Sequence, residues 1–237
     1  MISMKEAIIL AGGLGTRLRS VVSDVPKCMA PVAGHPFLYY IFQYLRQYEI
    51  THVVLSLGYK HEIVTDWVRQ QGFGSGVTFS IEESPLGTGG AIRKALTYIQ
   101  GKEALVLNGD TFFEVDLDRF YAFHLQSQLP VSLALKPMEK FERYGNVELD
   151  ADGVIRAFHE KKYCDKGYIN GGVYWVNKDK TLFQGCPERF SFEADILQQK
   201  VQQGLLNGFV SEGYFIDIGI PEDYEKSNHD FADRKWQ

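Results

Sequence analysis

The sequence is poor in cysteine, contains no long apolar run and carries no excess of basic residues. Its 237 residues include three cysteines, Cys28, Cys164 and Cys186, an odd number without a C-x-x-C pair, which argues against a disulfide framework and predicts reduced thiols. No stretch approaches the roughly 20 apolar residues that a membrane-spanning helix needs. With 25 Lys+Arg against 30 Asp+Glu the formal charge is −5, whereas a nucleic-acid binder would need clustered positive charge. We therefore expect a cytoplasmic protein that binds neither membranes nor nucleic acid.

Short apolar segments alternate with helical patterns in the first half of the sequence. The apolar segments are hydrophobic on both faces, as in a parallel sheet that is covered on both sides, and they span 7–10, 53–57, 77–81 and 104–107. Between them, apolar side chains recur at helical spacing over 36–48, 62–71 and 88–99. This alternation predicts a doubly wound α/β sheet with right-handed crossovers.

Extended segments separated by turn signals dominate the second half, over 131–135, 146–149, 154–159 and 168–176. Helical patterns return at 192–203 and 221–233. No linker rich in proline or serine separates the halves, and the sequence contains no internal repeat. We therefore predict a single α/β domain over 1–237, in which the second half extends the same sheet.

A glycine-rich turn follows the first predicted strand. Gly12, Gly13 and Gly15 have no Cβ, so their backbone N–H groups could approach and bind phosphate oxygens. Arg17 and Lys27 would supply positive charge beside those phosphates. The turn matches neither the dinucleotide fingerprint G-x-G-x-x-G nor a P-loop. A plain structural connector is the alternative, but the flanking arginine and lysine favour phosphate binding.

Two aspartates stand at the ends of apolar strand-like segments. Asp110 ends Leu105-Val-Leu-Asn-Gly-Asp110, and Asp217 ends Tyr214-Phe-Ile-Asp217. Ligands of open α/β sheets bind at the carboxyl ends of the strands, and carboxylates with phosphate oxygens make a suitable site for Mg²⁺. Each aspartate could instead cap a turn or a helix, and sequence spacing alone does not bring the two together.

These motifs, in this order, resemble those of the sugar-1-phosphate nucleotidyltransferases, and the resemblance spans almost the whole chain. The segments that carry it are 10–19 with Pro26-Lys27, Asn108-Gly-Asp110, Phe158-His-Glu-Lys161, Asn170-Gly-Gly172 and Ile216-Asp-Ile-Gly219. Finer details resemble the D-glycero-α-D-manno-heptose 1-phosphate guanylyltransferases, namely Pro85-Leu-Gly-Thr-Gly-Gly90, Leu107-Asn-Gly-Asp-Thr-Phe-Phe113, Arg143-Tyr-Gly145, Ile169-Asn-Gly-Gly172, Phe190-Ser-Phe-Glu193 and Phe215-Ile-Asp-Ile-Gly219.

The resemblance implies a Rossmann-like core with a mixed, mostly parallel central sheet. About 1–125 would form the nucleotide-binding half, and about 126–237 the sugar-phosphate-binding half. It also implies a Mg²⁺-dependent reaction in which GTP and a heptose 1-phosphate give GDP-heptose and pyrophosphate, for a bacterial surface polysaccharide such as capsule or lipopolysaccharide. No protein nucleophile is required, so catalysis would depend on positioning and on neutralising phosphate charge.

The same resemblance assigns roles to individual residues. The catalytic residues would be Arg17, Lys27 and Asp110, and Asp110 and Asp217 would be the metal ligands. The nucleotide would be bound by Leu10, Ala11, Gly12, Gly13, Gly15, Thr16, Glu82, Gly87, Thr88, Asn108 and Gly109. Lys161 would hold the sugar phosphate, and the other residues around the sugar would be Gly145, Glu160, Asn170 and Gly171.

Choice of the base depends on a carboxylate before the 85–90 turn, either Glu82 or Glu83. A carboxylate only accepts hydrogen bonds, which suits the two adjacent donors of guanine and not the acceptor of uracil or thymine. The alternative is a solvated pair of glutamates at a strand end.

The function of the chain and the role of one aromatic stripe have alternatives at this point. The enzyme could be a mannose-1-phosphate guanylyltransferase or a uridylyl- or thymidylyltransferase for another sugar. The chain could also be a catalytically silent binder of nucleotide sugars that regulates a partner enzyme. The aromatic stripe over 37–48 suits either the core or a homodimer contact.

Overall fold

The computed structural model describes residues 5–13, 18, 22, 24–73, 76–232 and 234. Its strands are β1 (Glu6–Leu10), β2 (Pro31–Val32), β3 (His35–Pro36), β4 (His52–Leu57), β5 (Val77–Ile81), β6 (Glu103–Asn108), β7 (Thr111–Phe113), β8 (Val131–Phe141), β9 (Asn146–Leu149), β10 (Ile155–Phe158), β11 (Cys164–Asn177), β12 (Leu206–Val210) and β13 (Phe215–Asp217). Its α-helices are α1 (Phe37–Arg46), α2 (His61–Gln70), α3 (Gly87–Ala95), α4 (Leu117–Ser127), α5 (Gln198–Gln202) and α6 (Pro221–Ala232). A π-helix over Phe192–Leu197 runs into α5, and 3-10 turns cover Lys27–Met29 and Leu96–Tyr98.

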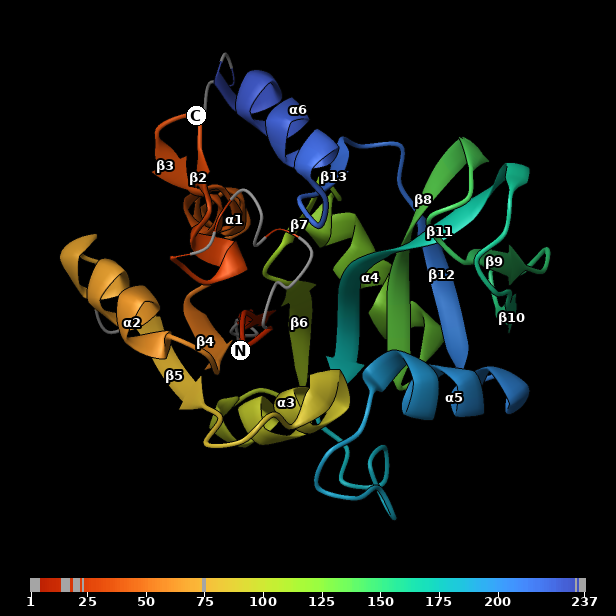
Figure 1. Cartoon of the computed structure of the whole chain (residues 1–237). Helices are drawn as coiled ribbons and strands as arrows, with labels where there is room; N and C mark the ends of the chain where they lie inside the picture. The colour runs from red at the N-terminus through yellow and green to blue at the C-terminus, as the bar shows by residue number, and fades with distance from the viewer. Residues whose placement is uncertain are drawn as a thin grey trace.

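One nine-stranded sheet runs through both halves of the chain. Strands β5, β4, β1 and β6 are parallel neighbours, as predicted, and β11 pairs antiparallel with β6. Strand β8 pairs antiparallel with β11 and parallel with β12. Strand β9 pairs antiparallel with β11, and β10 pairs antiparallel with β9. In Figure 1 the first half lies on the left in red to yellow, and β8 to β12 lie on the right in green to blue. The predicted mixed, mostly parallel sheet of a single α/β domain is therefore confirmed.

Alternate residues of the central strands face two separate hydrophobic clusters. In β1, Ala7 and Ile9 face the cluster to which α1, α2, α4 and α6 contribute, and Ile8 faces the cluster with α3, the π-helix and α5. A sheet apolar on both faces needs a helical layer on each side, so the fold has three layers. The aromatic stripe of α1 belongs to the first cluster, where Phe37, Tyr40 and Tyr44 are at most 2% exposed.

The predicted helices match the structure with two differences. The pattern over 192–203 forms a π-helix followed by a short α-helix rather than one continuous α-helix. Helix α4 is an element that the periodicity analysis did not identify; Asp116 caps it by accepting a hydrogen bond from the backbone N–H of Arg119. Its buried side chains, Leu117, Phe120 and His124, face the sheet.

Candidate active site

The carboxyl ends of β1, β4 and β6 meet at one edge of the sheet. In register, Leu10 lies between Ser56 of β4 and Asn108 of β6. The glycine turn after β1 and Asp110 after β6 therefore emerge side by side, at the edge where open α/β sheets bind ligands.

A cavity of about 740 Å³ lies at this edge. Most of the predicted nucleotide-binding residues that the structure describes line it, together with Asp110, namely Leu10, Gly12, Gly13, Glu82, Gly87, Thr88 and Asn108. Gly15, Thr16 and Arg17 lie outside the described residues. Glu83, the predicted alternative to Glu82, also lines the cavity. The other wall residues had no predicted role and are Ser56, Gly58, Tyr59, Ser84, Pro85 and Ala91.

Ala11 and Gly109, two further predicted nucleotide residues, are not among the residues that line the cavity. The N–H of Ala11 donates to the carbonyl of Ser56 over 2.8 Å, and that of Gly109 donates to the carbonyl of Leu10 over 2.9 Å. Both are backbone links between strand ends, so in this arrangement they shape the turn rather than face the cavity.

The start of α3 forms one wall of the cavity and depends on glycine. Gly87 has φ +71°, and a Cβ on it would lie 2.4 Å from the carbonyl oxygen of Phe190. That carbonyl also accepts the N–H of Gly89 over 3.0 Å. A segment of the second half of the chain therefore supports the nucleotide side of the site from behind.

Glu82 lies at the end of β5 with both carboxylate oxygens engaged. Oε1 accepts the hydroxyl of Ser56 over 3.3 Å, and Oε2 accepts the N–H of Leu86 over 2.9 Å. Ser56 is the polar exception on a buried apolar strand, a sequence signal that could have identified it. The carboxylate closes the turn that leads into α3. Both glutamates line the cavity, but Glu83 is exposed and Glu82 is partly buried.

Lys27 holds together the two aspartates that the sequence could not pair. Its Nζ lies 2.6 Å from Oδ2 of Asp110 and 3.4 Å from Oδ1 of Asp217, and its side chain is 12% exposed. The pairing of β7 with β13 causes the juxtaposition, because Asp217 is the register partner of Thr111, the neighbour of Asp110. The N–H of Ile218 also donates to the carbonyl of Asp110 over 3.0 Å.

The two carboxylates suit a divalent cation whose remaining ligands would come from the substrate and from water. Burial, and next the charge of Asp110, raises the pKa of Asp217 above its ordinary value, while Lys27 opposes the shift. Added positive charge would relieve this repulsion. Among the described residues no group of three or more His, Cys, Asp and Glu side chains forms a metal site. Two carboxylates plus phosphate oxygens and water are the ligand set that Mg²⁺ commonly takes.

Cys28 follows Lys27 and is 2% exposed. Burial, followed by the charge of Asp110, raises the pKa of its thiol to about 12. A thiol with that pKa is protonated at pH 7, so Cys28 fills space and is not a nucleophile.

The predicted sugar-binding residues fall into two groups. At the Asn170-Gly-Gly172 segment the pairing of β11 with β8 shifts register, and a Cβ on Gly172 would lie 2.6 Å from Nδ2 of Asn108. This irregular part of β11, which we call the β11 bulge (residues 170–172), therefore adjoins the nucleotide cavity. Glu160 and Lys161, in contrast, lie exposed between β10 and β11 and do not line the cavity.

Gly145 lies directly before β9. A Cβ there would lie 2.5 Å from the carbonyl oxygen of His159, so glycine allows the chain to approach the end of β10. Glu193, which accepts a hydrogen bond from the hydroxyl of the cavity residue Thr88, lies in a motif of the family resemblance but received no predicted role.

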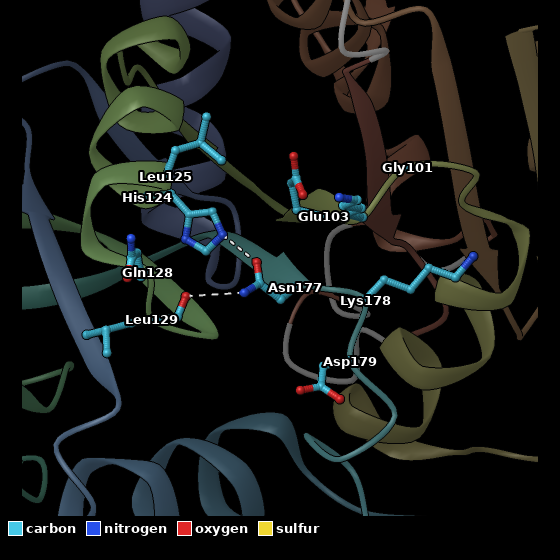
Figure 2. Close-up of a pocket in the computed structure, with 10 residues that line it drawn as sticks. Gly101, Glu103, His124, Leu125, Gln128, Leu129, Asn177, Lys178 and Asp179 are labelled. Carbon is cyan, nitrogen blue, oxygen red and sulfur yellow. Dashed lines mark hydrogen bonds between the residues drawn. The ribbon is translucent and has the colours of Figure 1, made fainter. Parts of the chain in front are cut away.

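A second cavity of about 470 Å³ lies at the opposite end of β6 and β11 (Figure 2). His124 is one of its lining residues, with Nδ1 2.6 Å from the hydroxyl of Ser132 and Nε2 2.8 Å from Oδ1 of Asn177. Because a carbonyl oxygen only accepts, Nε2 carries the proton and Nδ1 accepts from Ser132. Burial lowers the pKa of His124, so the neutral ring is a structural bridge between α4 and the sheet.

No helix in the described ranges combines the length and the apolar content required to cross a bilayer.

Comparisons with known proteins agree on one family. A family model described as nucleotidyl transferase matches residues 6–234. The chain is 50% identical over 222 residues to a D-glycero-alpha-D-manno-heptose 1-phosphate guanylyltransferase from Aneurinibacillus thermoaerophilus, covering 94% of this chain and 96% of the relative. It is 43% identical to a protein of the same name from Campylobacter jejuni, over 92% of this chain and 96% of the relative. The structure of HddC from Yersinia pseudotuberculosis complexed with GMP-PN superposes with a TM-score of 0.86 at 40% identity, covering 96% of this chain and 100% of HddC.

Proposed function

The chain belongs to the nucleotidyl transferase family, and from that membership we propose that it transfers a guanylyl group from GTP to D-glycero-α-D-manno-heptose 1-phosphate. The products are GDP-heptose and pyrophosphate. The names of two relatives that match nearly full length support this substrate pair, as does a similar structure that was solved with GMP-PN. The structural observation that carries the proposal is the placement of Lys27 between Asp110 and Asp217, beside the cavity that the glycine turn lines.

In the proposed reaction an oxygen of the sugar phosphate attacks the α-phosphorus of GTP. The new P–O bond forms as the bond between the α-phosphorus and its bridging oxygen to the β-phosphate breaks, and pyrophosphate leaves. A phosphate monoester has a second pKa near 6, so at pH 7 the attacking oxygen is already ionised and no general base is required. The buried, protonated thiol of Cys28 takes no part.

The protein contributes charge and orientation. Lys27 places an ammonium group beside the α-phosphate and lowers the cost of charge that develops there. We assign Arg17 the same task at the triphosphate, and the backbone of Gly12 and Gly13 the contact with phosphate oxygens. Asp110 and Asp217 would hold Mg²⁺, which when bound would neutralise phosphate charge and so lower the cost of releasing pyrophosphate.

The two halves of the chain divide the substrates in this proposal. Residues of about 1–125 hold the nucleotide, and residues of about 126–237 hold the sugar phosphate. Asn170 and Gly171 lie at the β11 bulge, beside the cavity. Gly145, Glu160 and Lys161 would complete the sugar site from the ends of β9 and β10, and Glu160 and Lys161 are exposed there.

Glu82 is the residue that we propose selects guanine. Ser56 and Leu86 hold its carboxylate in place, and each oxygen retains acceptor capacity for a base in the cavity. Glu82→Gln should lower the GTP-over-UTP preference in kcat/KM at least tenfold, since the amide replaces an acceptor with a donor. Glu83→Gln, at the exposed neighbour, is the matched control and should leave the preference unchanged. An unchanged preference in Glu82→Gln would exclude this role.

The test of the proposed function is a pyrophosphate-release matrix. Four nucleoside triphosphates are combined with heptose, mannose, glucose and N-acetylglucosamine 1-phosphates, with Mg²⁺ and with EDTA. Turnover restricted to GTP with the heptose, and dependent on Mg²⁺, is the expected result. Preference for another pair would keep the chemistry and replace the substrate, and release without a sugar phosphate would contradict nucleotidyl transfer.

A further inference from the structure

Two hydroxyl groups on the wall of the nucleotide cavity each donate to a carboxylate. The hydroxyl of Ser56 donates to Oε1 of Glu82 over 3.3 Å, and the hydroxyl of Thr88 donates to Oε2 of Glu193 over 2.6 Å. The second distance is that of a charge-assisted hydrogen bond, which is roughly twice as strong as a neutral one. Because an ionised carboxylate only accepts, the direction of both bonds is fixed. Both hydroxyls therefore turn their hydrogens to the protein and not to a ligand.

The side chain of Thr88 keeps one acceptor position after its bonds to other described residues are counted. A hydroxyl has one hydrogen to donate and two lone pairs that accept. The hydrogen goes to Glu193, and one lone pair accepts the N–H of Phe192 over 2.8 Å. The second lone pair is left for the cavity that Thr88 lines. The side chain of Thr88 can therefore receive a hydrogen bond from a ligand, but it cannot give one.

Glu193 is held against α3 by the segment that precedes it. The carbonyl of Phe190 accepts the N–H of Gly89 over 3.0 Å, which also uses a backbone donor of the first turn of α3 away from the ligand. The hydroxyl of Ser191 donates to Oε2 of Glu193 over 3.0 Å, beside the bond from Thr88. Glu193 itself lies in the first turn of a π-helix, a geometry that occurs frequently at functional sites. The carboxylate is thus fixed in position where it controls the hydroxyl of Thr88.

We propose that Glu193 is a positioning residue that makes the side chain of Thr88 an acceptor for a hydrogen-bond donor of the bound nucleotide. The donor is the 2-amino group of guanine or a hydroxyl group of the ribose, which share this chemistry. Glu82 lines the same cavity and also accepts, so this part of the wall selects ligands that present donors. A ligand with an acceptor there would leave two acceptors facing each other unpaired. The inference rests on the proposed function, since it requires a guanine nucleotide in this cavity.

The experiment compares GTP with three analogues, each of which lacks one donor. ITP lacks the 2-amino group, and 2′-deoxy-GTP and 3′-deoxy-GTP each lack one ribose hydroxyl. The kcat/KM of each nucleotide is measured by pyrophosphate release with Mg²⁺ and saturating heptose 1-phosphate. Thr88→Val removes the hydroxyl and keeps the shape of the side chain. We expect it to lower kcat/KM for GTP at least about threefold, within the usual net value of one hydrogen bond, and to leave one analogue within about 1.5-fold of its wild-type value.

Glu193→Met removes the carboxylate and keeps a side chain of similar length. The hydroxyl of Thr88 can then turn its hydrogen toward the cavity, where it would oppose the donor of the nucleotide. We expect kcat/KM for GTP to fall at least about threefold, and the analogue that is insensitive to Thr88→Val to be insensitive here too. Glu193→Ala makes the same test with a smaller side chain if the methionine variant does not fold.

Thr97→Val is the matched control for the loss of a threonine hydroxyl. Thr97 is exposed, it does not line the cavity, and its hydroxyl donates to the carbonyl of Lys94 over 2.7 Å. Its kcat/KM should stay within about 1.5-fold of wild type for all four nucleotides, as expected for a surface substitution.

The pattern across the four nucleotides separates a lost hydrogen bond from general support of the site. General support would lower kcat/KM for all four by one factor, whereas a lost hydrogen bond spares the analogue that never made it. An equal loss for all four in Thr88→Val or in the folded Glu193 variants overturns the inference, and so does an unchanged kcat/KM for GTP. Insensitivity of different analogues in the two sets of variants also overturns it, because the two residues would then not serve one donor. A wild-type chain that releases no pyrophosphate from GTP and heptose 1-phosphate overturns the proposed function, and the inference with it.

Discussion

Replacing Lys27 by methionine tests the electrostatic account of the site directly. The substitution keeps most of the apolar stem and removes the ammonium that separates Asp110 from Asp217. Because Nζ lies 2.6 Å from one carboxylate oxygen and 3.4 Å from the other, those oxygens are no more than about 6 Å apart. At an effective dielectric constant of about 20, two unit charges at about 6 Å repel by about 3 kcal/mol.

Solvent reduces that figure, since the side chain of Asp110 is 38% exposed. We expect Lys27→Met to lose about 2 kcal/mol of unfolding free energy at pH 7, or about 4–8 °C in melting temperature for a chain of this length. At pH 4 the loss should shrink, because protonation of Asp217 removes the repulsion. Millimolar Mg²⁺ should raise the melting temperature of the variant more than that of the wild type. Turnover should fall at least about 100-fold, as when one charge-stabilising group is removed from an active site.

The assay is thermal unfolding at pH 4 and pH 7, with and without Mg²⁺, beside pyrophosphate release. Lys166→Met is the matched control, because that lysine pairs with Glu139 at 3.6 Å on the surface and is 80% exposed. Its loss should stay below about 0.5 kcal/mol. A loss in Lys27→Met that is equal at both pH values and insensitive to Mg²⁺ would show that packing, not charge, is responsible, and would refute the reasoning.

Three further variants test the structure away from Lys27. Because the folded-state pKa of Asp217 is raised, its contribution to stability is present below about pH 4 and is lost as the pH rises through the folded value. Asp217→Asn should therefore raise the melting temperature at pH 7 while abolishing turnover; a clearly lower melting temperature would contradict this. The lowered folded-state pKa of His124 has the opposite sign: its stabilisation is complete above about pH 6.5 and is lost as the pH falls through the folded value. Urea titrations between pH 5 and 7 should show a shallower pH dependence in His124→Gln, and an unchanged slope would exclude His124 as its source. Gly87→Ala should cost at least about 1 kcal/mol more in urea than Gly34→Ala, because both positions have positive φ but only a Cβ at Gly87 meets a neighbour, the carbonyl of Phe190; equal costs would remove the steric argument.

The sequence patterns predicted the parallel half of the sheet well because both of its faces are buried. The segment 77–81 coincides with β5. The predicted strands 7–10 and 53–57 are one residue short at their start, and 104–107 is one residue short at each end. Helix α4 was missed although local signals exist: Asp116 is a good N-cap, and Leu117, Phe120 and His124 follow at helical spacing. The π-helix over Phe192–Leu197 has no sequence signature of its own, and the contact of the preceding Phe190 carbonyl with the N–H of Gly89 in α3 is a tertiary contact that no local pattern encodes.

The site residues also divide into those that local sequence patterns place and those that depend on tertiary contacts. Leu10, Gly12 and Asn108 could be placed from sequence because they follow strands whose carboxyl ends must meet. The meeting of Asp110 with Asp217, and of Thr88 with Glu193, depends on tertiary pairings that no local pattern encodes. Ala11 and Gly109 show the converse: they lie in the right motif, but their N–H groups are already used between strand ends.

The contacts between the two halves argue that neither could form the site alone. Strand β11 covers the edge of β6 through pairs such as Val173 with Leu107, and without it that edge would expose unpaired backbone beside buried leucines. The N–H of Gly89, at the start of α3, donates to the carbonyl of Phe190. The pairing of β13 with β7 places Asp217 beside Lys27. The nucleotide side therefore takes its geometry from the part of the chain that we assign to the sugar phosphate, so a truncated first half would not retain the arrangement of Lys27, Asp110 and the start of α3.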